Sequence, residues 1–114
     1  MGISVLRLKY MDRKYPKKTI KAPTSLQGIL WSKNIKNINL EKDKVYIIHQ
    51  VLGYGSLQQI KWLFRVYKPT EIQEVFEKYP KKVYLPSVFY FVKNFILNLK
   101  SKKLPPQIYV KTLF

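Results

Sequence analysis

Apolar side chains recur every three or four residues through most of the chain after position 39, which predicts a series of amphipathic helices. The first predicted helix covers residues 40–53, with Asn39 as its N-cap. The second covers residues 56–67, where Ser56 and Gln59 have the spacing of a capping box. The centre of the chain is therefore expected to be helical.

Two more helices are predicted after these. Thr70 and Gln73 have the spacing of a second capping box and open a short helix over residues 70–79. The fourth helix covers residues 85–99 and has Pro86 in its first turn, where proline is tolerated because no partner for its amide is needed. Short connections between the four helices predict a compact bundle.

The fourth predicted helix is apolar nearly all round, so it is either central in the bundle or part of an interface. One stripe along it, expected to face the core, contains Val88, Val92, Phe95, Ile96 and Leu99. Three further apolar side chains lie off this stripe, and we expect them to form a partner interface: Phe89, Phe91 and Leu97.

Both ends of the chain have short stretches with the loose alternation and composition of strands, at residues 3–11 and 107–114. A lone strand is not stable, so the simplest expectation is that these two pair with each other. The fold class is then mainly α with minor β. We expect residues 1–25 to be a basic N-terminal strand and arm, and residues 26–114 to be a single helical domain with a C-terminal strand.

Charge is distributed unevenly along the chain, which carries a net charge of +16 over 114 residues. Residues 1–25 have seven Lys or Arg and one acid, and residues 81–114 have seven and none. Residues 26–80 are closer to balance, with eight basic and five acidic side chains. A packed centre with cationic flanks favours a phosphate-rich polyanion as partner.

The candidate phosphate contacts lie in these two flanks. Lysines outnumber arginines nineteen to three, which favours backbone contact over the reading of bases, since bidentate recognition of guanine prefers arginine. Binding is therefore expected to depend on salt and to have little sequence specificity. The residues are Arg13, Lys14, Lys17, Lys18, Lys21, Lys81, Lys82, Lys93, Lys100, Lys102 and Lys103.

The sequence offers little for catalysis. His49 is the sole histidine and lies beside Ile48 on a helix, a placement more typical of a structural residue. Three glutamates at positions 71, 74 and 77 share one helix, which usually indicates a solvated face rather than a metal site. Residues 53–55, Gly-Tyr-Gly, lack the further residues of a phosphate-binding loop. We expect no enzymatic activity, no metal and no cofactor.

Residues 56–79 have the lengths of a helix-turn-helix, with a short turn at residues 68–70. The three glutamates of the second helix would repel DNA phosphates. Trp62 and Phe64 are also bulky for a tightly packed helix pair. We therefore expect that this pair does not read DNA.

A set of core motifs resembles a known family. Leu30-Trp31 is followed by Ile47-Ile48 with Val51-Leu52 and Gly55, and then by the segment Trp62-Leu63-Phe64-Arg65-Val66-Tyr67. This pattern, from about Leu30 to Leu99, resembles an uncharacterised family of small helical bacterial and archaeal proteins that accompany nucleotidyltransferase-type toxins. The resemblance implies an antitoxin or regulator role. Ser32 replaces the aspartate usual in that family, so no role tied to that carboxylate is carried over.

Two hypotheses follow. The first is a nucleic-acid-binding protein, a DNA-binding regulator or antitoxin that contacts phosphates with its basic ends; DNA and RNA both remain open as the partner. The alternative is a protein-interaction module that neutralises a toxin partner without nucleic acid. A homodimer is left open. The chain has no cysteine, no apolar run of membrane-spanning length and no signal-peptide pattern, so we expect a cytoplasmic protein without a membrane partner.

Overall fold

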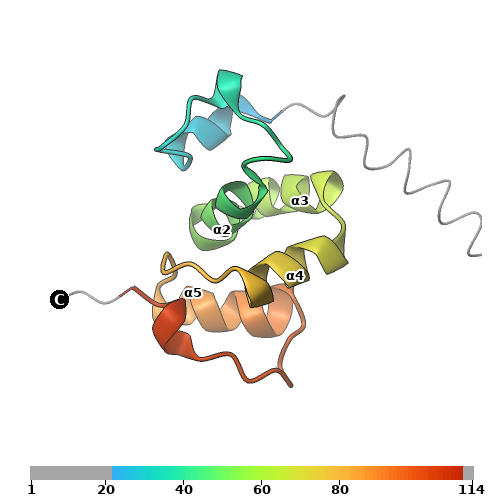
Figure 1. Cartoon of the computed structure of the whole chain (residues 1–114), viewed down its shortest axis with the longest axis vertical. Helices are drawn as coiled ribbons and strands as arrows, with labels where there is room; N and C mark the ends of the chain where they lie inside the picture. The colour runs from blue at the N-terminus through green and yellow to red at the C-terminus, as the bar shows by residue number, and fades with distance from the viewer. Residues whose placement is uncertain (1–21, 112–114) are drawn as a thin grey trace, which may run out of the picture.

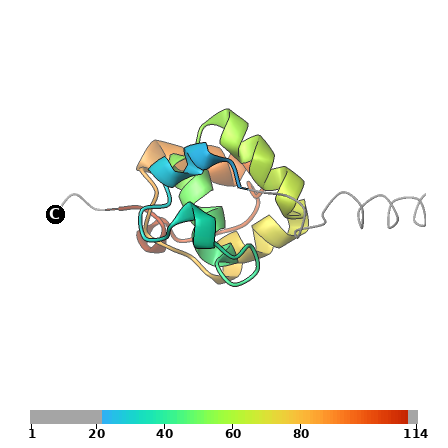
Figure 2. The same ribbon diagram turned by 90° about the horizontal axis from the view of Figure 1, so that it is seen from above.

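Helices stacked in layers make up the part of the chain that the computed structural model describes, residues 22–111 (Figure 1). Two 3-10 helices, η1 (Thr24–Gly28) and η2 (Ile35–Asn37), form one end of the stack. Seen along the stack, the layers superpose within one rounded outline (Figure 2). The α-helices of this part are α2 (Lys44–Tyr54), α3 (Leu57–Val66), α4 (Pro69–Lys78) and α5 (Pro86–Phe91).

The prediction of a mainly α fold with helices in these four places is confirmed. At the start of α3 the capping box is present, because the Ser56 amide donates to Gln59 Oε1 at 2.9 Å and the Gln59 amide donates to Ser56 Oγ at 3.2 Å. Pro86 lies in the first turn of α5, as expected.

Two predicted helix starts are wrong. Asn39 Oδ1 accepts from the amides of residues 41 and 42, but this closes a turn, and α2 begins only at Lys44. At α4, Thr70 and Gln73 form no capping box. The helix begins one residue earlier, at Pro69, whose fixed φ suits a first helical position, and Glu71 accepts from the Lys68 amide at 3.4 Å.

The helix continues after α5 as a π turn, η3 (Val92–Ile96), in which the Leu97 amide donates to Val92 O, five residues back. Its predicted inward face is wrong at Phe95, which is 66% exposed. Val92 and Leu99 are buried and Val88 and Ile96 are half-buried against the core, as expected. Leu97, predicted at an interface, is buried. Phe89, also predicted at an interface, is fully buried.

The predicted C-terminal strand over residues 107–114 is wrong for the residues described here. Pro105 and Pro106 instead start a 3-10 helix, η4 (Pro106–Ile108), since a proline ring fixes φ and removes an amide donor. After η4 a single parallel β-bridge joins Val110 to Tyr84. The described residues contain no strand. The predicted strand at 3–11 and most of the predicted arm lie outside the described residues.

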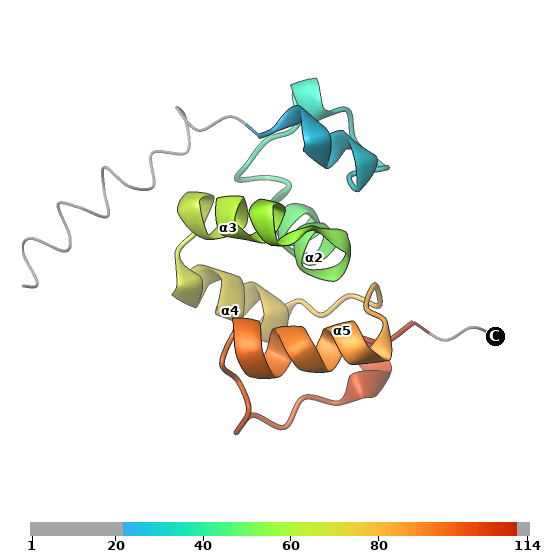
Figure 3. The ribbon, with the colours of Figure 1, turned by 180° about the vertical axis from the view of Figure 1, so that it is seen from behind.

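The C-terminal segment is held in place by tyrosines. Figure 3 shows that the chain passes beneath α5 and returns to the edge where α5 begins. There Tyr109 is buried with its ring stacked on Phe76 at 4.6 Å between centroids. Its hydroxyl donates to Phe76 O, and burial raises the pKa of Tyr109 to about 12. The C-terminal segment is therefore part of the core.

His49 connects α2 to the segment that follows α4. Its side chain is fully buried, with Nε2 at 2.6 Å from Tyr79 O and Nδ1 at 2.8 Å from the hydroxyl oxygen of Tyr84. Because a carbonyl can only accept, Nε2 carries the proton and Nδ1 accepts from Tyr84. Burial is the main cause that lowers the pKa of His49 to about 4. The side chain is thus held neutral, in a structural position.

We predict that acid destabilises the protein through His49. Its pKa is about 4 in the folded protein and 6.5 for a histidine exposed to water, as in the unfolded chain, so the unfolded chain binds the proton more strongly and stability falls as the pH drops below 6.5. Between pH 7.5 and 4.5 the loss in free energy of unfolding should be about 2 to 3 kcal/mol. Urea unfolding at a series of pH values measures it.

The loss in free energy of unfolding should begin at pH values above those at which Asp43 takes up a proton. The pKa of Asp43 is lowered from 3.8 mainly by a hydrogen bond from the Asn39 amide. Since the chain has one histidine, the ring resonances in an NMR titration belong to His49 alone. A midpoint near 6.5 for the folded protein, or a stability that stays constant down to pH 5, would contradict the buried arrangement.

A second prediction concerns the end of α2. A Cβ on Gly55 would lie 2.5 Å from Val51 O, the same oxygen that accepts from the Gly55 amide at 2.8 Å. Gly55→Ala should therefore lower the free energy of unfolding by about 1 to 3 kcal/mol. At Gly28 a Cβ would meet no atom within 4 Å, so Gly28→Ala is the matched control and should be neutral or stabilising. Equal stabilities for the two variants in urea would contradict the prediction.

Candidate nucleic-acid interface

Positive charge is in excess across the described residues, which contain fifteen Lys and Arg against five Asp and Glu. Four of the five carboxylates are held by lysines; one of these pairs joins α2 to α4, and another joins α4 to the segment after α5. They are Lys33–Asp43, Lys44–Glu71, Lys78–Glu74 and Lys102–Glu77. The fifteen basic and five acidic side chains leave the described residues with a net charge of +10.

The three glutamates of α4 form ion pairs with different lysines. Glu71 is 3.1 Å from Lys44 on α2, Glu74 is 3.3 Å from Lys78 one turn along, and Glu77 is 3.7 Å from Lys102. No group of three potential metal ligands is present among residues 22–111. The expectation that these side chains bind no metal stays a prediction.

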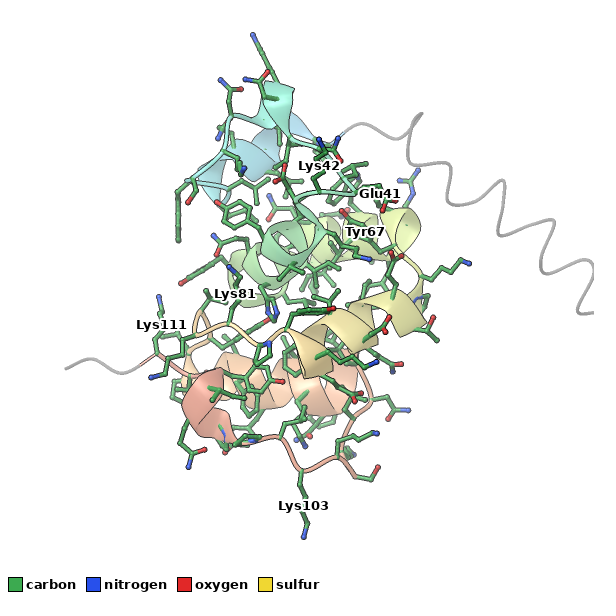
Figure 4. All side chains as sticks on the ribbon, viewed as in Figure 1. Glu41, Lys42, Tyr67, Lys81, Lys103 and Lys111 are labelled. Atoms are coloured by element: carbon green, nitrogen blue, oxygen red, sulfur yellow. The ribbon has the colours of Figure 1, made fainter. Side chains whose placement is uncertain are left out.

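Three exposed lysines gather at the edge where the α4–α5 connection meets the C-terminal segment. The Tyr84 amide donates to Tyr109 O at 3.1 Å, and the Lys111 amide donates to Tyr84 O at 2.9 Å. Lys111 therefore lies beside the connection that contains Lys81 and Lys82. Figure 4 shows Lys81 and Lys111 on this same edge of the molecule. No ion pair among the described residues involves any of the three lysines.

The Tyr54 ring lies next to Lys111, and the Trp31 ring lies next to Tyr54. Its Nζ donates to the Tyr54 hydroxyl at 2.6 Å and sits 4.8 Å from the centre of the Tyr54 ring. The Trp31 ring contacts Tyr54 at 4.8 Å between centroids, with the two planes 59° apart. Trp31 is 64% exposed. We call Trp31, Tyr54, Lys81, Lys82 and Lys111 the aromatic–basic edge.

Trp31 is exposed although its loop is fixed on both sides. Leu30 before it is fully buried, and the amide of Ser32 after it donates to the Tyr46 hydroxyl at 2.9 Å. The Gln27 side chain donates to Lys33 O at 2.9 Å and accepts from the Ile35 amide at 2.8 Å. These bonds close the loop around Trp31, so the ring is presented to solvent by an ordered backbone.

The other sequence-predicted contacts are not brought together at this edge. Lys100, Lys102 and Lys103 lie in the connection after the π turn, and Figure 4 shows Lys103 at the far end of the stack from η1 and η2. The prediction that Lys93 is a surface contact is wrong. Lys93 follows the buried Phe89 by four residues and so lies on the same inward face of the helix; it is 8% exposed, and its Nζ donates to Lys100 O at 3.4 Å.

Arg13, Lys14, Lys17, Lys18 and Lys21 lie outside the described residues, so their role stays a prediction. Sequence reasoning placed Lys81 and Lys82 among the candidate contacts, but it missed Trp31, Tyr54 and Lys111 as binding residues. The last three are far apart in the sequence, and only the tertiary contacts bring them together. The one local signal was a tryptophan beside the polar run Ser32-Lys33-Asn34.

No helix of residues 22–111 is long and apolar enough to cross a membrane. No curated protein and no solved structure matches the chain. Residues 26–76 are similar to a family of unknown function (DUF6922). The similar segment runs from η1 into α4, so it includes Trp31 and Tyr54 but ends before the three lysines of the edge.

Proposed function

We propose that this protein binds nucleic acid, with the aromatic–basic edge as a contact surface and the basic N-terminal residues as further phosphate contacts. The observation that carries the proposal is the grouping of three uncompensated lysines beside an exposed, ordered tryptophan. Cationic side chains interleaved with aromatic rings are the features by which proteins hold phosphates and bases together.

The electrostatics support this proposal. The described residues carry a net charge of +10, and four of their five carboxylates are already bound to lysines outside the edge. A phosphate backbone approaching the edge would release its counterions on meeting these lysines. A regulator or antitoxin that binds its own operator or transcript would use such a surface. Lysines in place of arginines favour contact without a strict sequence requirement.

The proposal predicts a salt-dependent affinity that the edge lysines supply. We expect the triple variant Lys81→Ala, Lys82→Ala, Lys111→Ala to bind an oligonucleotide more weakly and to lower the slope of log K against log salt by about two to three. Fluorescence anisotropy over a salt series measures both. The thermal melt should change little, because all three side chains are exposed.

The matched control removes the same charge from another edge. Lys61, Arg65 and Lys68 are exposed on α3 and at the α3–α4 turn, which Figure 1 shows on the opposite side from the α4–α5 connection. Their triple alanine variant should keep most of the affinity. Equal losses in the two variants would contradict a localised site, and absence of binding by the unaltered protein at low salt would overturn the proposed function.

A second candidate function, a protein-interaction module that neutralises a toxin, is favoured by a separate apolar surface. Phe91 and Phe95 are 47% and 66% exposed, with their rings 6.0 Å apart. Lys100 Nζ lies 5.0 Å from the centre of the Phe95 ring. Large aromatic rings exposed side by side are typical of protein interfaces.

This second candidate predicts that Phe91→Ser with Phe95→Ser abolishes co-purification with the product of a neighbouring gene while oligonucleotide binding is unchanged. Co-expression followed by size-exclusion chromatography measures it. The control is Leu57→Ser, which alters a side chain that is also exposed, at the start of α3. If the unaltered protein elutes as a separate peak after co-expression with each neighbouring gene product, the result would count against the toxin-binding role.

A further inference from the structure

Trp31 has a ring face that no described contact covers. The Tyr54 ring meets it at an angle of 59°, so the two rings touch without stacking face to face. Burying a tryptophan ring stabilises a protein, and leaving it 64% exposed on a loop closed by hydrogen bonds forgoes that gain. A flat, ordered and exposed ring suits a flat apolar ligand that stacks on it.

Tyr54 links this ring to a cation. Lys111 Nζ lies 4.8 Å from the centre of the Tyr54 ring and donates to its hydroxyl at 2.6 Å, which positions the ammonium group. No ion pair among the described residues joins this ammonium group to a carboxylate. The backbone bond from Lys111 to Tyr84 fixes its main chain as well. A stacking surface and a positioned ammonium group thus both contact one tyrosine.

We infer that the aromatic–basic edge binds single-stranded nucleic acid in preference to duplex, with Trp31 stacking on an unpaired base and Lys111 contacting an adjacent phosphate. This inference rests on the proposed function and narrows its substrate. In a duplex both faces of an internal base are covered by its neighbours, whereas a single strand can turn a base outward onto an aromatic ring. Arg65, the one arginine of the described residues, lies on α3 rather than at this edge, so base identity should matter little.

The test compares a single-stranded oligonucleotide of about 12 nucleotides with the duplex of the same sequence by fluorescence anisotropy, using DNA and RNA versions of the single strand. Trp31→Ala should weaken binding of the single strand by about five- to a hundredfold, the range of one base–aromatic stack. Duplex binding should change little. The salt slope should also be unchanged, because the substitution removes no charge.

Phe95→Ala is the matched control, since Phe95 is 66% exposed against 64% for Trp31 and lies on the π turn. It should keep full affinity for the single strand. Trp31→Phe retains an aromatic face and should recover part of the affinity that Trp31→Ala loses. Intrinsic fluorescence gives a second measurement, because the oligonucleotide should quench the emission of the exposed Trp31. In the Trp31→Phe variant only Trp62 emits, and its emission should change little because the side chain is 7% exposed.

The outcomes separate this inference from the proposed function. Salt-dependent binding of duplex that equals or exceeds that of the single strand, or a Trp31→Ala variant with unchanged affinity, overturns the stacking site and leaves nucleic-acid binding standing. Binding of neither form at low salt overturns both. Displacement of the oligonucleotide by polyglutamate at equal charge concentration also overturns the inference, because it assigns the edge to an acidic polypeptide.

Discussion

The structure depends most on the attachment of the C-terminal segment to the buried aromatic core. Tyr109 stacks on Phe76 and donates to its carbonyl oxygen, and Tyr84 exchanges backbone hydrogen bonds with the residues on either side of Val110. His49 joins the same cluster to α2 through the hydroxyl of Tyr84. Each polar atom in these contacts has a hydrogen-bond partner, which offsets the cost of removing that atom from water. The helices α2, α4 and α5 and the C-terminal segment are therefore joined through one cluster.

This cluster also determines the surface. Because the bridge at Tyr84 ends at Lys111, the lysine emerges beside Tyr54 at the end of α2 and next to Lys81 and Lys82. Trp31 reaches the same place from the loop that Gln27 closes. The proposed contact surface is thus a consequence of core packing, and its side chains come from four separate segments of the chain.

The sequence predicted the four helices because their apolar spacing and the Ser56 cap are local signals. It misplaced Phe95 and Leu97 because the last helix is apolar nearly all round, so spacing alone offers more than one candidate inward stripe. Only the tertiary packing shows that Leu97 is buried and Phe95 exposed. The C-terminal alternation predicted a strand, but Tyr109 is buried in the core and the two prolines begin a 3-10 helix. Lysines 81 and 82 were predicted from charge alone. Trp31, Tyr54 and Lys111 could not be, since no local pattern brings them together.

The proposed contact of nucleic acid is with the aromatic–basic edge, and not with the surface of Phe91 and Phe95. An NMR titration of the isotope-labelled protein with a single-stranded oligonucleotide distinguishes the two surfaces, because each backbone amide and each indole reports separately. The Trp31 indole and the amides of Lys81, Lys82 and Lys111 should shift, while those of Phe91 and Phe95 stay in place. Shifts confined to α5 and the π turn, or no shifts at low salt, would rule out binding at this edge.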